Sequence, residues 1–575
     1  MIPMRDGIRL ATDVYRDVDA PSGPVLLLRT PYGKEAVRGS DLYPAMFAMF
    51  DLGFAVVYQD VRSTTKSEGG GFSGDTSDQS AMTDAADTFA WLRSQPWCDG
   101  KIGMFGASYM GFTQMRAVMN EDDDLVIAPS VSTYDGYHLP YMSLGGTQDL
   151  GTILSWTYML ALADAMRAGN VDDVGLILAV MSDPIGMVEH LPLIDHPLLD
   201  KYAPQWRAWM EHPDFDEAWQ QWYGFDPGKV RSPALHIGGW FDISNGATVR
   251  AYEMLRDGAA TEFARANQRL VMGPWTHGNS SGQTADVYFG LTSSFAGSGR
   301  DKIYGNFYRE TFAGQDASSK PVHIFVMGLN EWRDEEAWPL PDTRYVDYYL
   351  DSRGAANTSG GDGELRSSPP THVAADVYVY DPMNPAPSHG GVVFHPNEIG
   401  RSGPTNLSPI TGRSDVLAYS TPVLERDTEV TGPVRLVLHI SSSAPDTDFV
   451  GRLVDVHPDG RELFVTEGVI RARYRKLVEQ AGADGTRRGV RAGDRPDEHV
   501  PRVRAGTPDQ AARRQHQLPA LVAQLEHRWR HPIGARERLR ERGEPRAPRP
   551  RAPVEADPAD HRAAGPVSVG WVAGA

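Results

Sequence analysis

Ile102-Gly103-Met104-Phe105-Gly106-Ala107-Ser108-Tyr109-Met110-Gly111 is the stretch of sequence that decides the fold of this chain. The apolar run 102–105 predicts a buried strand, and the helix-forming residues 112–119 predict a helix directly after it. Between them lies Gly-x-Ser-x-Gly, which between a strand and a helix is the nucleophile elbow of an α/β-hydrolase. An ordinary glycine-rich turn with an incidental serine would give the same pentapeptide. The flanking strand and helix favour the elbow, so Ser108 is the candidate nucleophile.

The composition of the chain limits the classes of protein to consider. Its 575 residues, 41% hydrophobic and 23% charged, are typical of a globular protein with several domains. No apolar run is long enough for a membrane span, and the first residues lack the apolar core of a secretory signal. A single cysteine, Cys98, argues against a disulfide framework or a cysteine-based zinc site. The net charge of −19 disfavours nucleic acid and membrane partners, and we expect a cytoplasmic protein.

The order of periodic segments predicts the domain organisation. Apolar strands alternate with helices over 1–136 and again over 228–342, which predicts one mostly parallel sheet with helices on both faces. Residues 137–227 contain helix-like segments and no strand runs, and we interpret them as a helical cap inserted into the hydrolase domain. Over 343–476 the periodicity changes to two, in the short runs 345–350, 377–380, 434–440 and 452–456. This change predicts a separate β-sandwich.

Two later strands end at residues that complete a catalytic triad. An α/β-hydrolase requires an acid and then a histidine after the nucleophile, each just beyond the carboxyl end of a strand. Asp242 follows the apolar run that begins at Ala234, and His277 follows the run that begins at Leu270. A helix N-cap is the structural alternative for Asp242, and a loop histidine is the alternative for His277. No zinc-binding His-Glu-x-x-His motif is present, so we expect neither a metal nor another cofactor.

The triad predicts where an oxyanion would be stabilised. The backbone N–H of Tyr109, directly after the nucleophile, is the expected first donor because it lies at a helix N-terminus. The second donor should come from the loop after an early strand. That loop contains Tyr32, whose phenol can donate a hydrogen bond, although spacing alone favours a packing role for this residue.

Several motifs together resemble one known family. They are Arg-Thr-Pro-Tyr at 29–32, the segment 97–111, Gly-Trp-Phe-Asp at 239–242, Gly-Pro-Trp-Thr-His at 273–277, and the segments 326–333 and 444–449. With them the chain resembles the X-Pro dipeptidyl-peptidase and α-amino-acid ester hydrolase family, in particular its cocaine esterase-like members. The resemblance covers roughly residues 1–476.

The resemblance implies a fold and a set of functional residues. It implies an α/β-hydrolase body, a helical cap and a C-terminal jelly roll, and it makes the phenol of Tyr32 the second oxyanion donor. It also implies an acyl pocket lined by aromatic residues of the cap and by a jelly-roll loop. The pocket positions here are Trp156, Tyr141, Phe241, Val393 and Phe394. Tyr141 replaces a tryptophan, and Ser244 replaces an aromatic residue, so the pocket has less aromatic surface than a cocaine-binding site.

These observations favour a serine hydrolase that cleaves small-molecule carboxylic esters through an acyl-enzyme. The alternative within the family is an X-Pro dipeptidyl-peptidase or an α-amino acyl ester or amide hydrolase, which would need anionic groups to hold an ammonium. The cap offers Asp172 and Asp173 for that role. A non-catalytic scaffold is disfavoured by the complete triad. A homo-oligomer is compatible with the sequence but not indicated by it.

The resemblance stops near residue 477. The segment 477–575 contains 18 Arg and 13 acidic residues but no Lys, Phe or Tyr. A disordered Arg/Pro-rich extension is one interpretation. The other is a frameshift near residues 477–485, because residues 517–531, back-translated and read one base later, give NFPRWSRNSNTGGDI, which looks like the family's closing segment. The frameshift interpretation predicts an incomplete jelly roll without its last strands.

Overall fold

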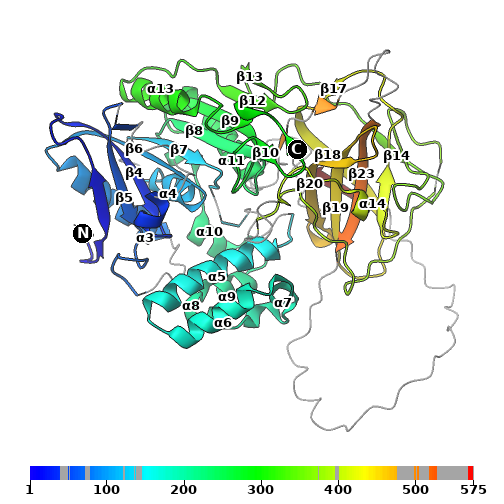
Figure 1. The fold of residues 1–575 in the computed structure, drawn as a ribbon, viewed down its shortest axis with the longest axis horizontal. Helices are drawn as coiled ribbons and strands as arrows, with labels where there is room; N and C mark the ends of the chain where they lie inside the picture. The colour runs from blue at the N-terminus through cyan, green and yellow to red at the C-terminus, as the bar shows by residue number, and fades with distance from the viewer. Residues whose placement is uncertain are drawn as a thin grey trace, which may run out of the picture.

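The computed structural model describes residues 1–38, 49–50, 52–70, 78–120, 124–134, 136–137, 145–372, 374–394, 401–475, 498–499, 502–503, 517–526 and 567–573. Figure 1 shows three parts: an α/β body, a group of helices beside it, and a β-rich domain formed by the later part of the chain. The fold class predicted from the sequence, an α/β-hydrolase with a helical insertion and a C-terminal all-β domain, is confirmed.

A mixed sheet of nine strands forms the centre of the α/β body. Its order is β13-β12-β9-β8-β7-β6-β4-β5-β3. Only the outer pairs β3–β5 and β12–β13 are antiparallel. The inner strands are almost continuously buried, as expected for a parallel sheet with both faces covered. The bounds are β3 (Thr12–Tyr15), β4 (Gly23–Thr30), β5 (Ala55–Asp60), β6 (Cys98–Ala107), β7 (Leu125–Ser130), β8 (Ala234–Phe241), β9 (Gln268–Thr276), β12 (Val322–Val326) and β13 (Glu331–Glu335).

Helices cover both faces of this sheet, and each face has its own hydrophobic core. One core includes Phe89, Met115 and Leu255, and the other includes Tyr304 and Phe307. Two short strand pairs, β1–β2 and β10–β11, lie outside the main sheet. The bounds are β1 (Ile2–Pro3), β2 (Arg9–Leu10), β10 (Gln283–Thr284), β11 (Val287–Tyr288), α1 (Lys34–Arg38), α3 (Asp78–Arg93), α4 (Tyr109–Ala117), α11 (Asn245–Gly258), α12 (Glu262–Ala266) and α13 (Arg300–Phe312).

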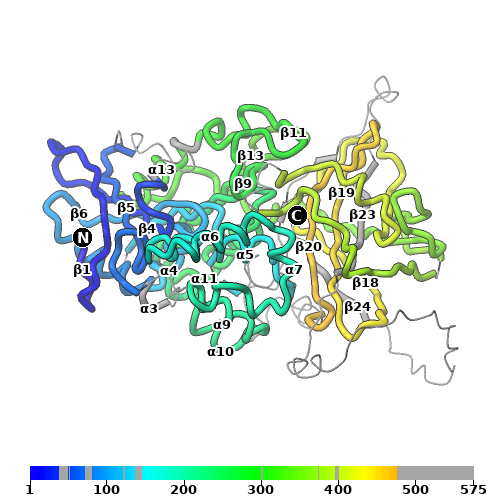
Figure 2. The backbone as a smooth tube through the Cα atoms, turned by 60° about the horizontal axis from the view of Figure 1, so that its bottom comes forward, coloured from blue at the N-terminus to red at the C-terminus, as the bar shows by residue number. Residues whose placement is uncertain are grey.

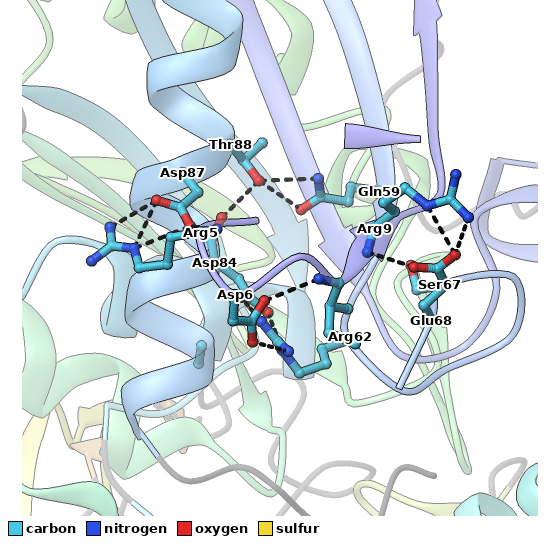
Figure 3. A network of polar contacts seen from close by, with 12 residues as sticks. Arg5, Asp6, Arg9, Gln59, Arg62, Ser67, Glu68, Asp84, Asp87 and Thr88 are labelled. Carbon is cyan, nitrogen blue, oxygen red and sulfur yellow. Dashed lines mark hydrogen bonds and ion pairs between the residues drawn. The ribbon is translucent and has the colours of Figure 1, made fainter. Parts of the chain in front are cut away.

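A network of charged residues fastens the N-terminal hairpin to α3 (Figure 3). Arg5 pairs with Asp87 at 2.7 Å, and Arg62 bridges Asp6 and Asp84 at 2.6 and 2.5 Å. Exposed ion pairs contribute little individually, but Asp84 is buried and its pairing is obligatory. Because Arg62 follows β5, the network holds the segment after β5 in place. That segment lies beside the end of β4, where the Val61 N–H donates to the Thr30 carbonyl.

Among the residues described between β7 and β8, six α-helices form the helical cap. Four of them begin at an Asp or Asn whose side chain accepts a hydrogen bond from the first helical turn. Its core is rich in aromatic side chains and includes Trp206 and Trp219. The bounds are α5 (Leu150–Arg167), α6 (Val171–Met181), α7 (Pro184–Glu189), α8 (Leu199–Tyr202), α9 (Gln205–Glu211) and α10 (Glu217–Tyr223). Among the helices that the structure describes, none has both the length and the apolarity needed to cross a bilayer.

The C-terminal domain contains two main sheets, of order β16-β23-β19-β20 and β21-β18-β24. Smaller pairs are β14–β15 and β17–β22, and one short helix, α14 (Ser408–Thr411), precedes β16. The bounds are β14 (Tyr349–Asp351), β15 (Glu364–Arg366), β16 (Val416–Tyr419), β17 (Thr428–Glu429), β18 (Gly432–Ile440), β19 (Asp448–Val456), β20 (Glu462–Arg471), β21 (Glu498–His499), β22 (Arg502–Val503), β23 (Gln517–Glu526) and β24 (Val567–Ala573). Figure 2 shows this domain beside the α/β body.

Two of the predicted strands in this domain are wrong. Residues 377–380 alternate in sequence but form no strand, and Val377 and Val379 are 73% and 83% exposed. Of residues 345–350, only the last two are in a strand, at the start of β14. Alternation of large apolar residues indicates a strand only where a partner strand and a covering layer are available.

The prediction that the β domain lacks its last strands is also wrong. Within 477–575, β23 lies between β16 and β19, and β24 pairs with β18 over seven residue pairs. The sequence signal for β24 is present, because Val567, Val569 and Trp571 alternate with small residues. The rest of this segment, apart from β21 and β22, lies outside the described residues. The frameshift hypothesis concerns the coding DNA and stays a prediction.

Buried His236 in β8 predicts a loss of stability in acid. Its Nε2–H donates to Oε1 of Gln268 at 2.9 Å, because the Gln268 amide nitrogen donates to two backbone carbonyls. Burial lowers the pKa of His236 from 6.5 to about 4. The folded state therefore resists protonation, and the associated stability is present above pH 6.5 and lost as the pH falls towards 4. Between pH 7 and pH 5 we expect this residue to remove about 2 kcal/mol of unfolding free energy.

Urea unfolding at several pH values measures this effect. The His236→Gln variant should lose less unfolding free energy than the wild type between pH 7 and pH 5, whatever its stability at pH 7. The exposed His439 offers a matched control, since His439→Gln should keep the wild-type dependence on pH. Identical slopes for all three proteins would contradict the assignment of acid sensitivity to His236.

Candidate active site

Ser108 occupies a strained turn between β6 and α4. Its φ and ψ are 57° and −125°, a conformation that a residue with a side chain rarely adopts. The neighbouring glycines make the turn feasible. A Cβ atom on Gly106 would lie 2.6 Å from the Met110 Cβ, and one on Gly111 would lie 2.4 Å from the Ser132 Cβ. The spacing Gly-x-Ser-x-Gly thus follows from the contacts of this turn.

The structure brings Ser108, His277 and Asp242 together. The Ser108 Oγ lies 2.9 Å from Nε2 of His277, and the His277 Nδ1 lies 2.8 Å from Oδ2 of Asp242. Asp242 directly follows β8 and His277 directly follows β9, and these two strands are parallel neighbours in the sheet. Although Ser108 is the N-cap residue of α4, its side chain makes no capping bond, which leaves its hydroxyl to the histidine.

The contacts of Asp242 fix its orientation. Its carboxylate is fully buried, and Oδ1 accepts a hydrogen bond from the backbone N–H of Ser244 at 2.6 Å. Oδ2 remains for Nδ1 of His277, and a carboxylate there selects the tautomer with hydrogen on Nδ1. Nε2 then carries a lone pair directed at the Ser108 hydroxyl.

Tyr32 and Tyr109 both lie beside this serine. Tyr109 is the first residue of α4, and backbone N–H groups in the first turn of a helix point out of its N-terminus. The two tyrosine rings meet edge to face, with their centroids 6.4 Å apart. Burial raises the pKa of Tyr32 to about 12, while hydrogen bonds with Trp156 and Ser108 oppose the rise. The phenol is therefore protonated at neutral pH and can act as a donor.

A hydrogen bond that sequence reasoning missed connects the cap to Tyr32. The indole Nε1 of Trp156, on α5, donates to the Tyr32 hydroxyl oxygen at 3.0 Å. The sequence resemblance gave Trp156 only a role in lining the acyl pocket. No signal in the sequence indicates this bond, because the two residues are 124 positions apart.

The other residues predicted to line the acyl pocket lie in different parts of the structure. Phe394 lies against His277, with the two ring centroids 4.9 Å apart, and the carbonyl of Phe394 accepts a hydrogen bond from Thr152 of the cap. The carbonyl of Val393 accepts a hydrogen bond from Ser402. Phe241 is 1% exposed and packs against Phe289 and Phe464, in the core shared with the C-terminal domain.

Two further expectations concern the pocket and a metal. Tyr141 lies outside the described residues. Ser244 is fully buried, and its hydroxyl has no hydrogen-bond partner among the described residues. In the same part of the chain, no group of three or more His, Cys, Asp or Glu side chains is arranged to hold a metal ion.

Comparison with known proteins places the chain in a family. The profile of the X-Pro dipeptidyl-peptidase (S15) family matches residues 6–279, and that of the X-Pro dipeptidyl-peptidase C-terminal non-catalytic domain matches residues 315–527. The chain is also 40% identical to the cocaine esterase of Rhodococcus sp. (strain MB1 Bresler), over 83% of each protein. The chain belongs to the S15 family. The sequence resemblance to this family is thereby confirmed.

Solved structures share the fold of most of the chain. An α-amino acid ester hydrolase aligns with 92% of this chain and 88% of its own, with a TM-score of 0.63 and 23% identity. An aminopeptidase from a marine sediment Thaumarchaeota archaeon aligns with the same shares of the two chains, with a TM-score of 0.65 and 22% identity. At these identities the likeness establishes the fold. The match of the C-terminal profile to residue 527 includes β23.

Proposed function

We propose that this chain is a serine hydrolase that cleaves small-molecule carboxylic esters through an acyl-enzyme intermediate. The observation that carries the proposal is the continuous contact from Ser108 through His277 to Asp242, at 2.9 and 2.8 Å, on a strained elbow. The 40% identity to a cocaine esterase supports an ester as the bond that is cleaved.

The geometry assigns a role to each member of the triad. His277 accepts the Ser108 proton at Nε2 while the serine oxygen attacks the acyl carbonyl. Asp242 keeps the imidazole in the required tautomer and stabilises the imidazolium that forms. His277 then returns the proton to the leaving alcohol, which gives the acyl-enzyme. A water molecule, activated by the same histidine, releases the acid.

Two donors face the charge that develops on the carbonyl oxygen. We assign these roles to the Tyr32 hydroxyl and the Tyr109 backbone N–H. Preorganised donors of this kind stabilise the tetrahedral intermediate more than the bound ester, so they raise kcat. The pKa of Tyr32, raised to about 12 by burial, keeps the donor protonated over the whole range in which such an enzyme works.

The acyl group is expected to contact Phe394 and Trp156. Phe394 lies over His277, and Trp156 lies over Tyr109, with ring centroids 4.9 and 6.3 Å apart respectively. Both contacts bring apolar surface to the triad.

The cap acids do not support the alternative substrate class. An α-amino acyl or X-Pro substrate carries an ammonium that needs an anionic partner. Asp173 is already paired with Lys201 at 2.5 Å and accepts a hydrogen bond from Tyr202, and Asp172 is exposed on the surface. Ester hydrolysis therefore remains the preferred function. The cytoplasmic location and the oligomeric state stay predictions.

A substrate comparison tests the function. We expect kcat/KM for p-nitrophenyl acetate or butyrate to be much higher than kcat/KM for Ala-Pro-p-nitroanilide. The reason is that the site has acyl-transfer groups, whereas Asp172 is exposed and Asp173 is already paired with Lys201. Faster cleavage of the peptide analogue would reverse the assignment in favour of the dipeptidyl-peptidase. The Ser108→Ala variant provides the background rate for both substrates.

A further inference from the structure

The hydrogen bond from Trp156 to Tyr32 joins the cap to the proposed oxyanion donor. Trp156 belongs to α5, whereas Tyr32 follows β4 of the central sheet. We propose that Trp156 is a positioning residue, whose indole N–H holds the Tyr32 hydroxyl so that its proton points at the oxyanion. The inference rests on the proposed acyl-transfer function. It adds that the cap takes part in transition-state stabilisation as well as in shaping the pocket.

The hydrogen-bonding capacities of the two groups fix the direction of the bond. An indole nitrogen can only donate, so the Tyr32 oxygen accepts at 3.0 Å. The phenol proton must then point away from the indole hydrogen. Among the described residues, the Ser108 side chain also interacts with the Tyr32 hydroxyl. The bond therefore directs the only proton of the phenol towards the reacting atoms.

The same bond also strengthens the donor. A hydroxyl that accepts one hydrogen bond becomes more polarised and donates a stronger second one. The Trp156 bond stabilises negative charge on the phenol oxygen and so opposes the burial that raises the pKa of Tyr32. A polarised hydroxyl in a water-poor site is well suited to stabilise a tetrahedral oxyanion.

The packing around Trp156 keeps the indole in place. Its ring stacks on Tyr109, with centroids 6.3 Å apart and an interplanar angle of 26°, and on Trp209, at 6.4 Å and 20°. Tyr109 supplies the other proposed oxyanion donor from its backbone. One indole therefore contacts both residues that carry the oxyanion donors, and rotation of the ring would break a stack as well as the hydrogen bond.

A purely apolar role for Trp156 predicts different kinetics. If the indole only contributes surface to the acyl pocket, Trp156→Phe keeps most of that surface and changes mainly KM. If the N–H positions Tyr32, the same variant lowers kcat, because the lost interaction acts in the transition state. We expect kcat for p-nitrophenyl butyrate to fall about tenfold with KM within about twofold, as for a lost buried hydrogen bond.

A double-mutant cycle isolates the hydrogen bond. The cycle combines Trp156→Phe with Tyr32→Phe, and kcat is measured per active site titrated with a fluorophosphonate. Once Tyr32 lacks its hydroxyl, Trp156→Phe should lower kcat by less than about twofold. An equal loss in both backgrounds would assign the effect to packing, and no loss of kcat in the wild-type background would overturn the inference outright.

A tetrahedral adduct gives a readout that does not depend on turnover. Butylboronic acid adds to the serine and places a boronate oxygen in the oxyanion site. Its Ki should rise about tenfold in Trp156→Phe when Tyr32 is present and stay constant when it is not. An unchanged Ki would contradict the positioning role.

A matched control separates this effect from loss of cap stability. Trp206 is buried in the same cap and donates its indole N–H to the Leu193 carbonyl at 2.8 Å. Trp206→Phe should lower Tm without changing kcat per titrated site. An inactive wild type would refute the proposed function itself. An active wild type without coupling between Trp156 and Tyr32 would refute only the further inference.

Discussion

Replacing Ser108 by alanine is expected to lower kcat for p-nitrophenyl butyrate by roughly 10⁵–10⁶, because the acyl-enzyme can no longer form. Oxyanion donors and binding would leave a small residual rate over water. Initial rates at saturating ester check the expected loss of activity. Circular dichroism and thermal melting of the same preparation check that the variant is folded. The stability should change little, because Ser108 Oγ makes its contact with His277 at a half-buried position.

A surface variant controls for effects of preparation. Ser94 is exposed and donates only to the carbonyl of Trp91, so Ser94→Ala should retain the wild-type rate. A Ser108→Ala protein that keeps more than a few per cent of the wild-type kcat would show that another residue is the nucleophile.

Removing the Tyr32 hydroxyl is expected to lower kcat by roughly 10²–10³ with KM changed less than about twofold. The phenylalanine keeps the ring and its edge contact with Tyr109, so only the donor is lost. Steady-state kinetics with the butyrate ester separate kcat from KM. Tyr288, 57% exposed, provides a Tyr→Phe control that should leave both constants unchanged. A change confined to KM would make Tyr32 a residue that positions the substrate.

The sequence predicted those residues of the candidate site that are marked by a local pattern in the chain. Ser108 is identified by small residues two positions away on each side, and the structure gives the reason in the contacts that a Cβ on Gly106 or Gly111 would meet. Asp242 and His277 were predicted because each follows an apolar run. Parallel neighbours bring their carboxyl ends to one edge of a sheet, so this local signal places both residues at the same site.

The sequence could not predict contacts that depend on how separate layers pack. The phase of α5 places Trp156 on a buried face but does not show which edge of its ring meets Tyr32. For the same reason Phe241 fits a pocket motif in sequence, yet its side chain packs into the core beneath the C-terminal domain. The strand β24 was missed because the Arg-rich composition of the last hundred residues was given more weight than the short alternation at 567–571. Residues 377–380 were wrongly predicted as a strand because an alternating sequence does not by itself supply a partner strand.

The position of the cap between β7 and β8 has a consequence for how such enzymes diversify. These strands are adjacent and parallel, with Ile127 opposite Ala234 and Ser130 opposite Ile237, so the chain leaves the sheet at the carboxyl end of β7 and crosses back to the amino end of β8. A cap of another length or sequence can be exchanged without changing the order of strands, provided that the incoming segment still makes this crossover. The exchange is not free of constraint, because an incoming cap that lacks an indole at the place of Trp156 would bring a new substrate range together with a slower chemical step.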